Sequence, residues 1–210
     1  KSGYSTKLYL DPQTEDAYNW NKIKESIQPG DYVLVALGIN DNSAQSWGTT
    51  ETEYQENLRI FIQDTRAAGG EILFQTPTVS GNAEGSGGWS YNTASGWARR
   101  GALMAEVAEE YGVVCLPLGA AMVQTFNEQA AQYIEAGDEA TDAYDKVRYA
   151  YYIYHSRLEE DWGFTTEEAD AYKDGADDTT HLNDNGAQSI AQLIAQLIGE
   201  SNSSLADYLK

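Results

Sequence analysis

Cysteine and histidine are scarce in this sequence. Its 210 residues include one cysteine, Cys115, and two histidines. One cysteine cannot close an internal disulfide, and so few thiol and imidazole groups argue against a zinc site. Cys115 lies in a short apolar run at 113–116, which predicts a buried core thiol and not a nucleophile.

Basic side chains and long apolar runs are also few. The 13 lysines and arginines stand against 33 aspartates and glutamates, which gives a net charge of −20. Nucleic acids and anionic membrane surfaces select basic proteins, so neither is expected as a partner. No apolar run is long enough to span a bilayer, and no signal peptide is present, although a mature secreted chain would look the same.

Motifs for metals, phosphates and dinucleotides are absent as well. Neither a phosphate-binding loop nor a dinucleotide fingerprint occurs, and the acidic residues Asp174, Asp177 and Asp178 lack the spacing of an EF-hand loop. We therefore expect neither a metal site nor a cofactor.

What the sequence does contain is an alternation of short apolar runs with segments of helical periodicity. The run 32–37 is continuously apolar, as in a strand buried on both faces of a parallel sheet. Further strands are predicted at 72–74 and 113–116, a loop at 80–90, and helices at 17–27, 50–68, 97–111, 119–136, 140–155, 165–173 and 185–199. The alternation predicts an α/β fold with a parallel sheet, and the length of 210 residues predicts one domain.

The helix predicted at 50–68 has the clearest pattern. The sequence Thr50-x-x-Glu53 forms a capping box at its start, and Gly69-Gly70 ends it. Its apolar face is predicted to consist of Tyr54, Leu58, Phe61, Ile62 and Thr65.

Two short polar motifs carry the chemistry. Asp178 and His181 are three residues apart, on an expected loop just before the last helix, where the carboxylate can orient the imidazole. Asn40 lies in a Gly-Ile-Asn-Asp motif after the run 32–37, at the end of a strand where parallel sheets place their sites. Either motif alone is often only a turn, and we expect Asp41 to cap backbone groups.

Taken in this order, with Gly3-Tyr4-Ser5 before them and Asn183-x-x-Gly186 after them, the motifs resemble the blocks of the SGNH, or GDSL-type, hydrolase family. The segments at 29–33 and 203–209 are similar to its rhamnogalacturonan acetylesterase branch. The resemblance implies a flavodoxin-like three-layer α/β/α sandwich with five parallel strands in the order 2-1-3-4-5.

The same resemblance implies a serine esterase that needs no cofactor. His181 would be the general base and Asp178 its orienter, while Gly3 and Asn40 would donate hydrogen bonds in the oxyanion hole. In contrast with the acetylesterase branch, which commonly has Gly-His-Asn-Asp, this chain has Ile39 before Asn40. His155, the other histidine, lies among tyrosines and is expected to pack and not to catalyse.

One block of the family, the Gly-Asp-Ser that carries the nucleophile, is not found in this chain. If Gly3 belongs to the second block, the first two strands of the fold, and the helix between them, lie outside residues 1–210. The run 32–37 should be central, but without those strands it becomes an edge. We therefore expect either that a complementary N-terminal segment or a second chain pairs with it and presents a serine, or that its flank is bare. Residues 1–210 alone are expected to fold poorly.

Ser5 is the alternative nucleophile within the chain. The sequence Gly3-Tyr4-Ser5-Thr6 can be compared with Gly-Asp-Ser-Thr, but no apolar strand precedes it. Only 35 residues separate Ser5 from Asn40, too few for the two strands and two helices expected between nucleophile and asparagine. Hydrogen bonding within its loop is the preferred interpretation.

The resemblance points to an enzyme that removes acetyl groups from plant cell-wall polysaccharide, either pectin (rhamnogalacturonan) or xylan. A secreted bacterial protein, active in pectin degradation, would suit the acidic and aromatic composition. Two alternatives stay open: a catalytically incomplete carbohydrate-binding or scaffold module, and a lipase-like SGNH esterase.

Substrate-binding groups are less well defined. Trp47 and Trp89 could stack on sugar rings or pack loops against the body of the protein. An anionic pectic substrate would need basic groups, for which the candidates are Lys7, Arg99, Arg100, Arg148 and Arg157. A neutral substrate such as acetylated xylan needs none.

Overall fold

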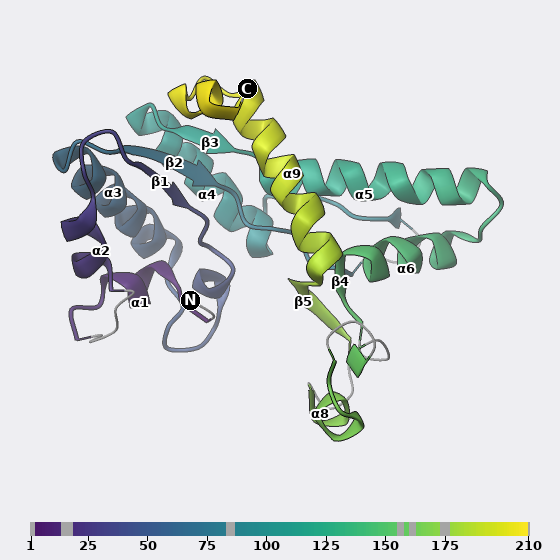
Figure 1. The fold of residues 1–210 in the computed structure, drawn as a ribbon. Coiled ribbons are helices and arrows are strands. Elements are labelled where there is room, and N and C mark those ends of the chain that lie inside the picture. The colour runs from purple at the N-terminus through teal and green to yellow at the C-terminus, as the bar shows by residue number, and fades with distance from the viewer. Residues whose placement is uncertain are drawn as a thin grey trace. The chain divides into compact units, whose positions relative to one another are not determined.

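The computed structural model describes residues 3–13, 19–82, 87–154, 158–159, 163–172 and 177–209. The chain forms two compact units (Figure 1). The first comprises Lys1–Thr78, Asn92–Gly119 and Ile194–Lys210, and the second comprises Val79–Tyr91 and Ala120–Leu193.

The first unit contains the parallel sheet that the sequence predicts. Its strands are β1 (Tyr32–Val35), β2 (Glu71–Gln75) and β3 (Val114–Leu116), in the order β1-β2-β3. All the pairings are parallel, with Val33 opposite Ile72 and Phe74 opposite Cys115. The helices of this unit include α1 (Thr6–Leu10), α2 (Trp20–Ser26), α3 (Glu51–Ala67), α4 (Gly96–Tyr111) and the second half of α9 (Asp184–Glu200), with the 3₁₀ turns η1 (Asn40–Asn42) and η5 (Ser204–Leu209).

Helix α3 supplies much of the core of this unit. Thr50 and Glu53 form the predicted capping box, and the buried residues of α3 are the five that the sequence predicts. Helix α4 packs against α3 and against β2 and β3, and ends at Gly112 in the left-handed conformation. Cys115 lies in β3, where burial raises the pKa of its thiol to about 12, so it is no nucleophile at neutral pH.

Strand β1 lies at the edge of the sheet. Within the described residues it pairs with β2 and with no strand on its other side, which is the bare flank that was one of the two expected outcomes. The regular strand also ends at Val35, two residues earlier than predicted. Leu34, with 42% of its surface exposed, and Ala36 point away from the core of this unit.

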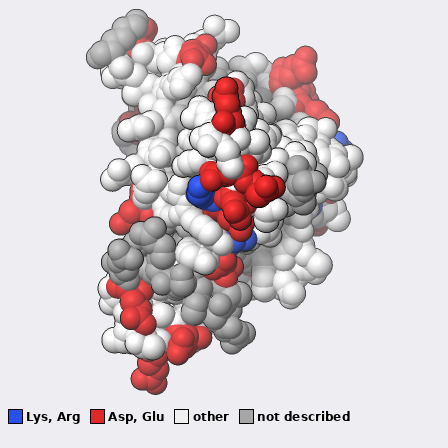
Figure 2. Space-filling model, turned by 90° about the vertical axis from the view of Figure 1, so that its right-hand side faces the viewer, with Lys and Arg blue, Asp and Glu red and all other residues white. Residues whose placement is uncertain are grey.

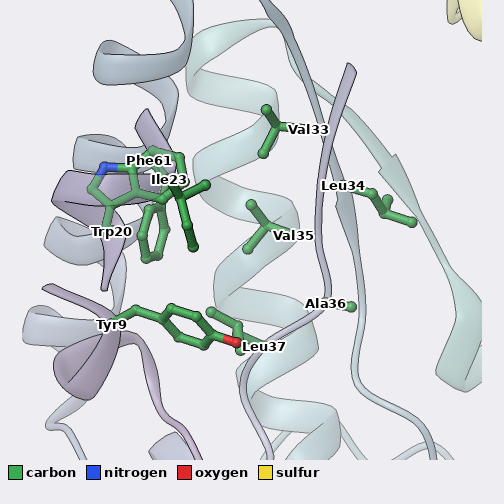
Figure 3. Close-up of a pocket in the computed structure, with 9 residues that line it drawn as sticks. All are labelled: Tyr9, Trp20, Ile23, Val33, Leu34, Val35, Ala36, Leu37 and Phe61. Carbon is green, nitrogen blue, oxygen red and sulfur yellow. The ribbon is translucent and has the colours of Figure 1, made fainter. Parts of the chain in front are cut away.

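An apolar cavity of about 290 Å³ opens beside β1. As Figure 3 shows, Val33, Val35 and Leu37 point from one face of the chain toward Trp20, Ile23 and Phe61, and Tyr9 closes the lower end. Among the described residues, β1 therefore presents a sheet edge without a partner strand next to an apolar groove.

The second unit is mainly helical. It contains most of α5 (Leu118–Glu135), then α6 (Ala140–Tyr151), β4 (Tyr152–Ile153), α8 (Thr166–Ala171), β5 (Asp178–Leu182) and the first half of α9 (Asp184–Glu200). Strands β4 and β5 are antiparallel. Two predictions are wrong here: the helix at 140–155 ends at Tyr151, and the segment with Asp178 and His181 is a strand and not a loop.

The core of the second unit is aromatic. Phe126 lies within 6.1 Å, centroid to centroid, of the rings of Trp89, Tyr151 and Tyr152. Trp89 is buried and donates through its indole N–H to the Ser80 carbonyl at 3.1 Å. It therefore holds its loop against the core, and its predicted alternative role as a sugar platform is wrong.

Acidic side chains outnumber basic ones, in keeping with the charge of −20. Figure 2 shows one face, over which Asp and Glu are spread and on which few Lys or Arg side chains appear. No helix in the described part of the chain is long and apolar enough to cross a membrane.

Candidate active site

Asp178 and His181 form a hydrogen-bonded pair in the second unit. His181 Nδ1 lies 2.6 Å from Asp178 Oδ2, within the range predicted for a catalytic dyad. The Asp178 carboxylate is fully buried, whereas 57% of the His181 side chain is exposed. Asp178 meets Nδ1 and not the other ring nitrogen, Nε2. A general base needs such a second nitrogen to take the proton of a nucleophile.

Hydrogen bonds to both oxygens hold the Asp178 carboxylate. Oδ1 accepts from the backbone N–H groups of Thr180 at 2.8 Å and His181 at 2.9 Å. Oδ2 accepts from the Tyr172 hydroxyl at 2.9 Å as well as meeting the His181 ring. A buried carboxylate is costly unless its oxygens are satisfied in this way, and the bonds also fix its orientation toward the imidazole.

The residues after the dyad hold strand β5 in place. The Asn183 side chain donates to the carbonyls of Tyr149 and Tyr152, and accepts from the Gly186 N–H at 2.8 Å. A Cβ on Gly186 would lie 2.0 Å from the Tyr151 carbonyl oxygen, so only glycine allows α9 to start this close to the end of α6. The Asn-x-x-Gly motif therefore has a structural role, because it fixes the chain directly after His181.

The candidate oxyanion donors lie in the first unit. The Asn40 amide, at the start of η1, donates to the Tyr4 carbonyl at 3.1 Å, so its side chain lies beside the loop that carries Gly3. Gly3 has φ of +77°, and no atom lies within 4 Å of where its Cβ would be. Gly38, two residues before Asn40, has no such room, because a Cβ there would lie 2.7 Å from Pro77.

Asp41 organises the loops around Asn40, as predicted for a capping residue. Its buried carboxylate accepts from the backbone N–H of Thr6 at 3.1 Å and from the hydroxyls of Thr6 and Thr49. Burial raises the pKa of this carboxyl, and the hydrogen bonds from Thr6 and Thr49 act against that rise. The buried Arg100 guanidinium donates to the Asp41, Thr49 and Thr50 carbonyls, which fixes the same loop from α4.

Ser5 has a structural role. It is fully buried, and its hydroxyl donates to the Trp47 carbonyl while accepting from the Leu8 N–H at the start of α1. The hydroxyl proton is thus committed to a carbonyl oxygen and not to a base. Ser5 forms hydrogen bonds as predicted, but as the N-cap of α1 and to the separate loop of Trp47.

The described basic candidates for binding an anionic substrate already have partners. Lys7 donates to the Ser46 carbonyl, Arg99 pairs with Glu51, Arg100 is buried, and Arg148 pairs with Asp145 and Asp177. Trp47 stays 38% exposed. Arg157 and His155 lie outside the described residues. In the described part of the chain, no group of three or more His, Cys, Asp or Glu side chains could hold a metal ion.

Sequence reasoning missed Tyr172 and Arg100 as residues that support the two motifs. Tyr172 lies six positions before Asp178 and belongs to no motif, so only the folded chain brings its hydroxyl to the carboxylate. Because His181 and Asp178 belong to one unit and Asn40 and Gly3 to the other, the convergence of the four groups stays a prediction.

Residues 1–189 match the model of the GDSL-like Lipase/Acylhydrolase family. The chain belongs to this family. The matched range includes both the Asp178–His181 pair and the loop of Asn40.

Two proteins of Bacillus subtilis (strain 168) are similar to this GDSL-like chain. Rhamnogalacturonan acetylesterase RhgT is 23% identical over 209 residues, which are 100% of this chain and 76% of that protein. The uncharacterized esterase YxiM is 36% identical over 55 residues, 26% of this chain and 14% of that protein.

The crystal structure of YxiM has the same fold. It matches 96% of this chain with a TM-score of 0.66 and 21% identity, and the match covers 44% of the YxiM chain. The chain thus spans less than half the length of YxiM. This chain has a parallel sheet flanked by helices, and it matches the YxiM structure. Both observations agree with the predicted three-layer α/β/α fold.

Proposed function

We propose that this protein is a serine esterase that removes acetyl groups from plant cell-wall polysaccharide. The observation that carries the proposal is the Asp178–His181 pair, a buried carboxylate bonded to an exposed imidazole in a GDSL-like chain. Similarity to a protein named rhamnogalacturonan acetylesterase supports a carbohydrate acetyl ester as the substrate. A secreted location follows as part of the same proposal, because a polysaccharide of the plant cell wall lies outside a bacterial cell.

In the proposed reaction His181 acts alternately as a base and as an acid. Its Nε2 takes the proton of a serine hydroxyl as the serine oxygen attacks the acetyl carbonyl, and Asp178 stabilises the resulting imidazolium. The Asn40 amide and the Gly3 N–H stabilise the oxyanion. The imidazolium then gives its proton to the sugar oxygen that leaves. Water attacks the acyl-serine as the same imidazole takes its proton, and this proton passes to the serine oxygen as acetate is released.

The nucleophile is the part that we propose to come from outside residues 1–210, on a complementary N-terminal segment or a second chain. The support is the bare edge of β1, with its unpaired backbone groups, and the apolar groove next to it. An apolar strand that adds to β1 would satisfy the backbone groups and cover Leu34. Its carboxyl end would then lie at the edge of the sheet that leads to Asn40, if the strand is parallel to β1.

A substitution on the edge of β1 tests this strand addition. Leu34→Lys should weaken, by about tenfold to a hundredfold, the binding of a peptide that carries an apolar strand ending in Gly-Asp-Ser, because it places a charge in the new apolar layer. Affinity is measured by fluorescence titration. Ile60→Lys on α3 is the matched control, since Ile60 is 39% exposed and Leu34 is 42% exposed. Equal affinities of the two variants would contradict strand addition at β1.

The charge of the substrate is a further part of the proposal. With the described basic candidates already engaged and a net charge of −20, a neutral polymer such as acetylated xylan suits this protein better than an anionic pectic backbone. Trp47, which is 38% exposed, is our candidate for stacking on sugar rings.

Acetate release from polymers tests both function and substrate. The complete enzyme, at low salt, should release acetate from acetylated xylan at least about tenfold faster than from acetylated rhamnogalacturonan, because a negatively charged backbone is repelled. The reverse order would assign a pectic substrate. Binding of either polymer without acetate release would favour the alternative of a non-catalytic carbohydrate-binding module, for which the absence of a Gly-Asp-Ser block is the supporting observation.

A further inference from the structure

Tyr172 shares one carboxylate oxygen with the candidate base. Its hydroxyl donates to Asp178 Oδ2 at 2.9 Å, and the same oxygen meets His181 Nδ1 at 2.6 Å. The other oxygen, Oδ1, is occupied by two backbone N–H groups of β5. Among these contacts Tyr172 is therefore the side-chain donor that competes directly with the imidazole for the charge of Asp178.

We propose that Tyr172 is a positioning residue that holds the Asp178 carboxylate toward His181 and sets how strongly this imidazole binds a proton. The catalytic role of Tyr172 rests on the proposed esterase function. Its effect on the Asp178–His181 pair does not. A donor on Oδ2 withdraws charge from the oxygen that faces the imidazolium, so it makes His181 a weaker base than Asp178 alone would. It also prevents the carboxylate from rotating out of the imidazole plane.

The Tyr172 ring is packed against apolar side chains of the second unit. The ring packs against Phe164 with centroids 6.0 Å apart, beside a small cluster formed by Ile153, Leu158 and Ala169. Tyr172 also ends α8, a short helix that begins with the capping box of Thr165 and Glu168. A ring held by these contacts has little freedom to rotate, so its hydroxyl is directed at the Asp178 carboxylate before any substrate binds.

The phenol remains a donor over the working range of an esterase. Burial, the hydrogen bond to Asp178 and its charge together raise the pKa of Tyr172 to about 12. Other charged side chains of this unit on elements near the dyad include Glu167, Glu168 and Asp170 on α8, Asp184 at the start of α9, and the ion pairs of Arg148 with Asp145 and Asp177. They are the same in the variants below, so their effect cancels in the comparison.

Tyr172→Phe separates a positioning role from packing, because it removes the hydroxyl and keeps the ring. In the complete enzyme, the NMR titration midpoint of the His181 ring should rise by about 0.5 to 1 pH unit, since Asp178 then stabilises the imidazolium more strongly. The acid limb of the kcat/KM profile should move to higher pH by the same amount. Tyr151→Phe is the matched control: its hydroxyl accepts from Gln129 and not from the dyad, so it should change stability alone.

A second variant keeps the test decisive if Tyr172→Phe folds poorly. Replacement of Tyr172 by 3-fluorotyrosine preserves shape and strengthens the donor, so the midpoint of His181 should fall. An unchanged midpoint in both variants, or equal shifts in Tyr172→Phe and Tyr151→Phe, would overturn the proposal. Shifted midpoints in a protein that hydrolyses no ester would uphold the role of Tyr172 and reject the esterase function instead.

Discussion

His181→Ala should reduce the turnover of p-nitrophenyl acetate by the complete enzyme by about 10⁴-fold or more. The side chain that is removed is the exposed imidazole bonded to the buried Asp178 carboxylate, so the variant loses the proposed base. Turnover is measured as p-nitrophenolate release under saturating substrate, with far-ultraviolet circular dichroism to verify the fold.

The other histidine supplies the control for this result. His155→Ala should change turnover less than about threefold, because the sequence pattern places it outside the catalytic motifs. Asp178→Asn should fall between the two variants, since it retains the shape but favours the wrong tautomer of the imidazole. Equal losses at positions 155 and 181 would overturn the assignment of the base.

Asn40→Ala should lower turnover by about 10²- to 10³-fold, the loss expected for one oxyanion donor. The structure allows a clean test, because the Asn40 amide bonds only to the Tyr4 carbonyl among the contacts described above, while the buried Asp41 and Arg100 hold the loop. KM should change little, since the oxyanion exists in the transition state and not in the bound ester.

The neighbouring residue distinguishes an oxyanion donor from a loop residue. Asp41→Asn removes the carboxylate that accepts from Thr6 and Thr49, and should lower the melting temperature by several degrees. Asn40→Ala should leave the melting temperature within about two degrees of the parent. A large fall in stability for Asn40→Ala, with a small loss of turnover, would assign Asn40 to the loop and not to the chemistry.

Sequence patterns predicted those features that depend on interactions between residues close together in the chain. Helix α3 shows this best, because its capping box and its apolar face both follow from residues within one segment. The Asp178–His181 contact was also predictable, since a spacing of three residues brings the two side chains together on either a turn or an irregular strand.

Other features depend on contacts between distant segments, and sequence reasoning missed them. Strand β5 exists because it pairs with the two residues of β4, which lie at the end of a segment with helical periodicity. Trp89 is buried by Phe126 and Tyr144, although its own neighbours are glycine and serine. Arg100 looked like a surface cation, but three backbone carbonyls around Asn40 replace its hydration shell.

The bare edge of β1 also bears on colloidal behaviour. Unpaired backbone groups beside exposed apolar side chains such as Leu34 are a template for pairing between copies of the chain. The net charge of −20 opposes such encounters by repulsion, which acts over about 30 Å at 0.01 M salt but only about 8 Å at physiological ionic strength. Salt concentration therefore decides whether repulsion or edge pairing dominates, and residues 1–210 should stay dispersed in dilute buffer and associate as the ionic strength rises.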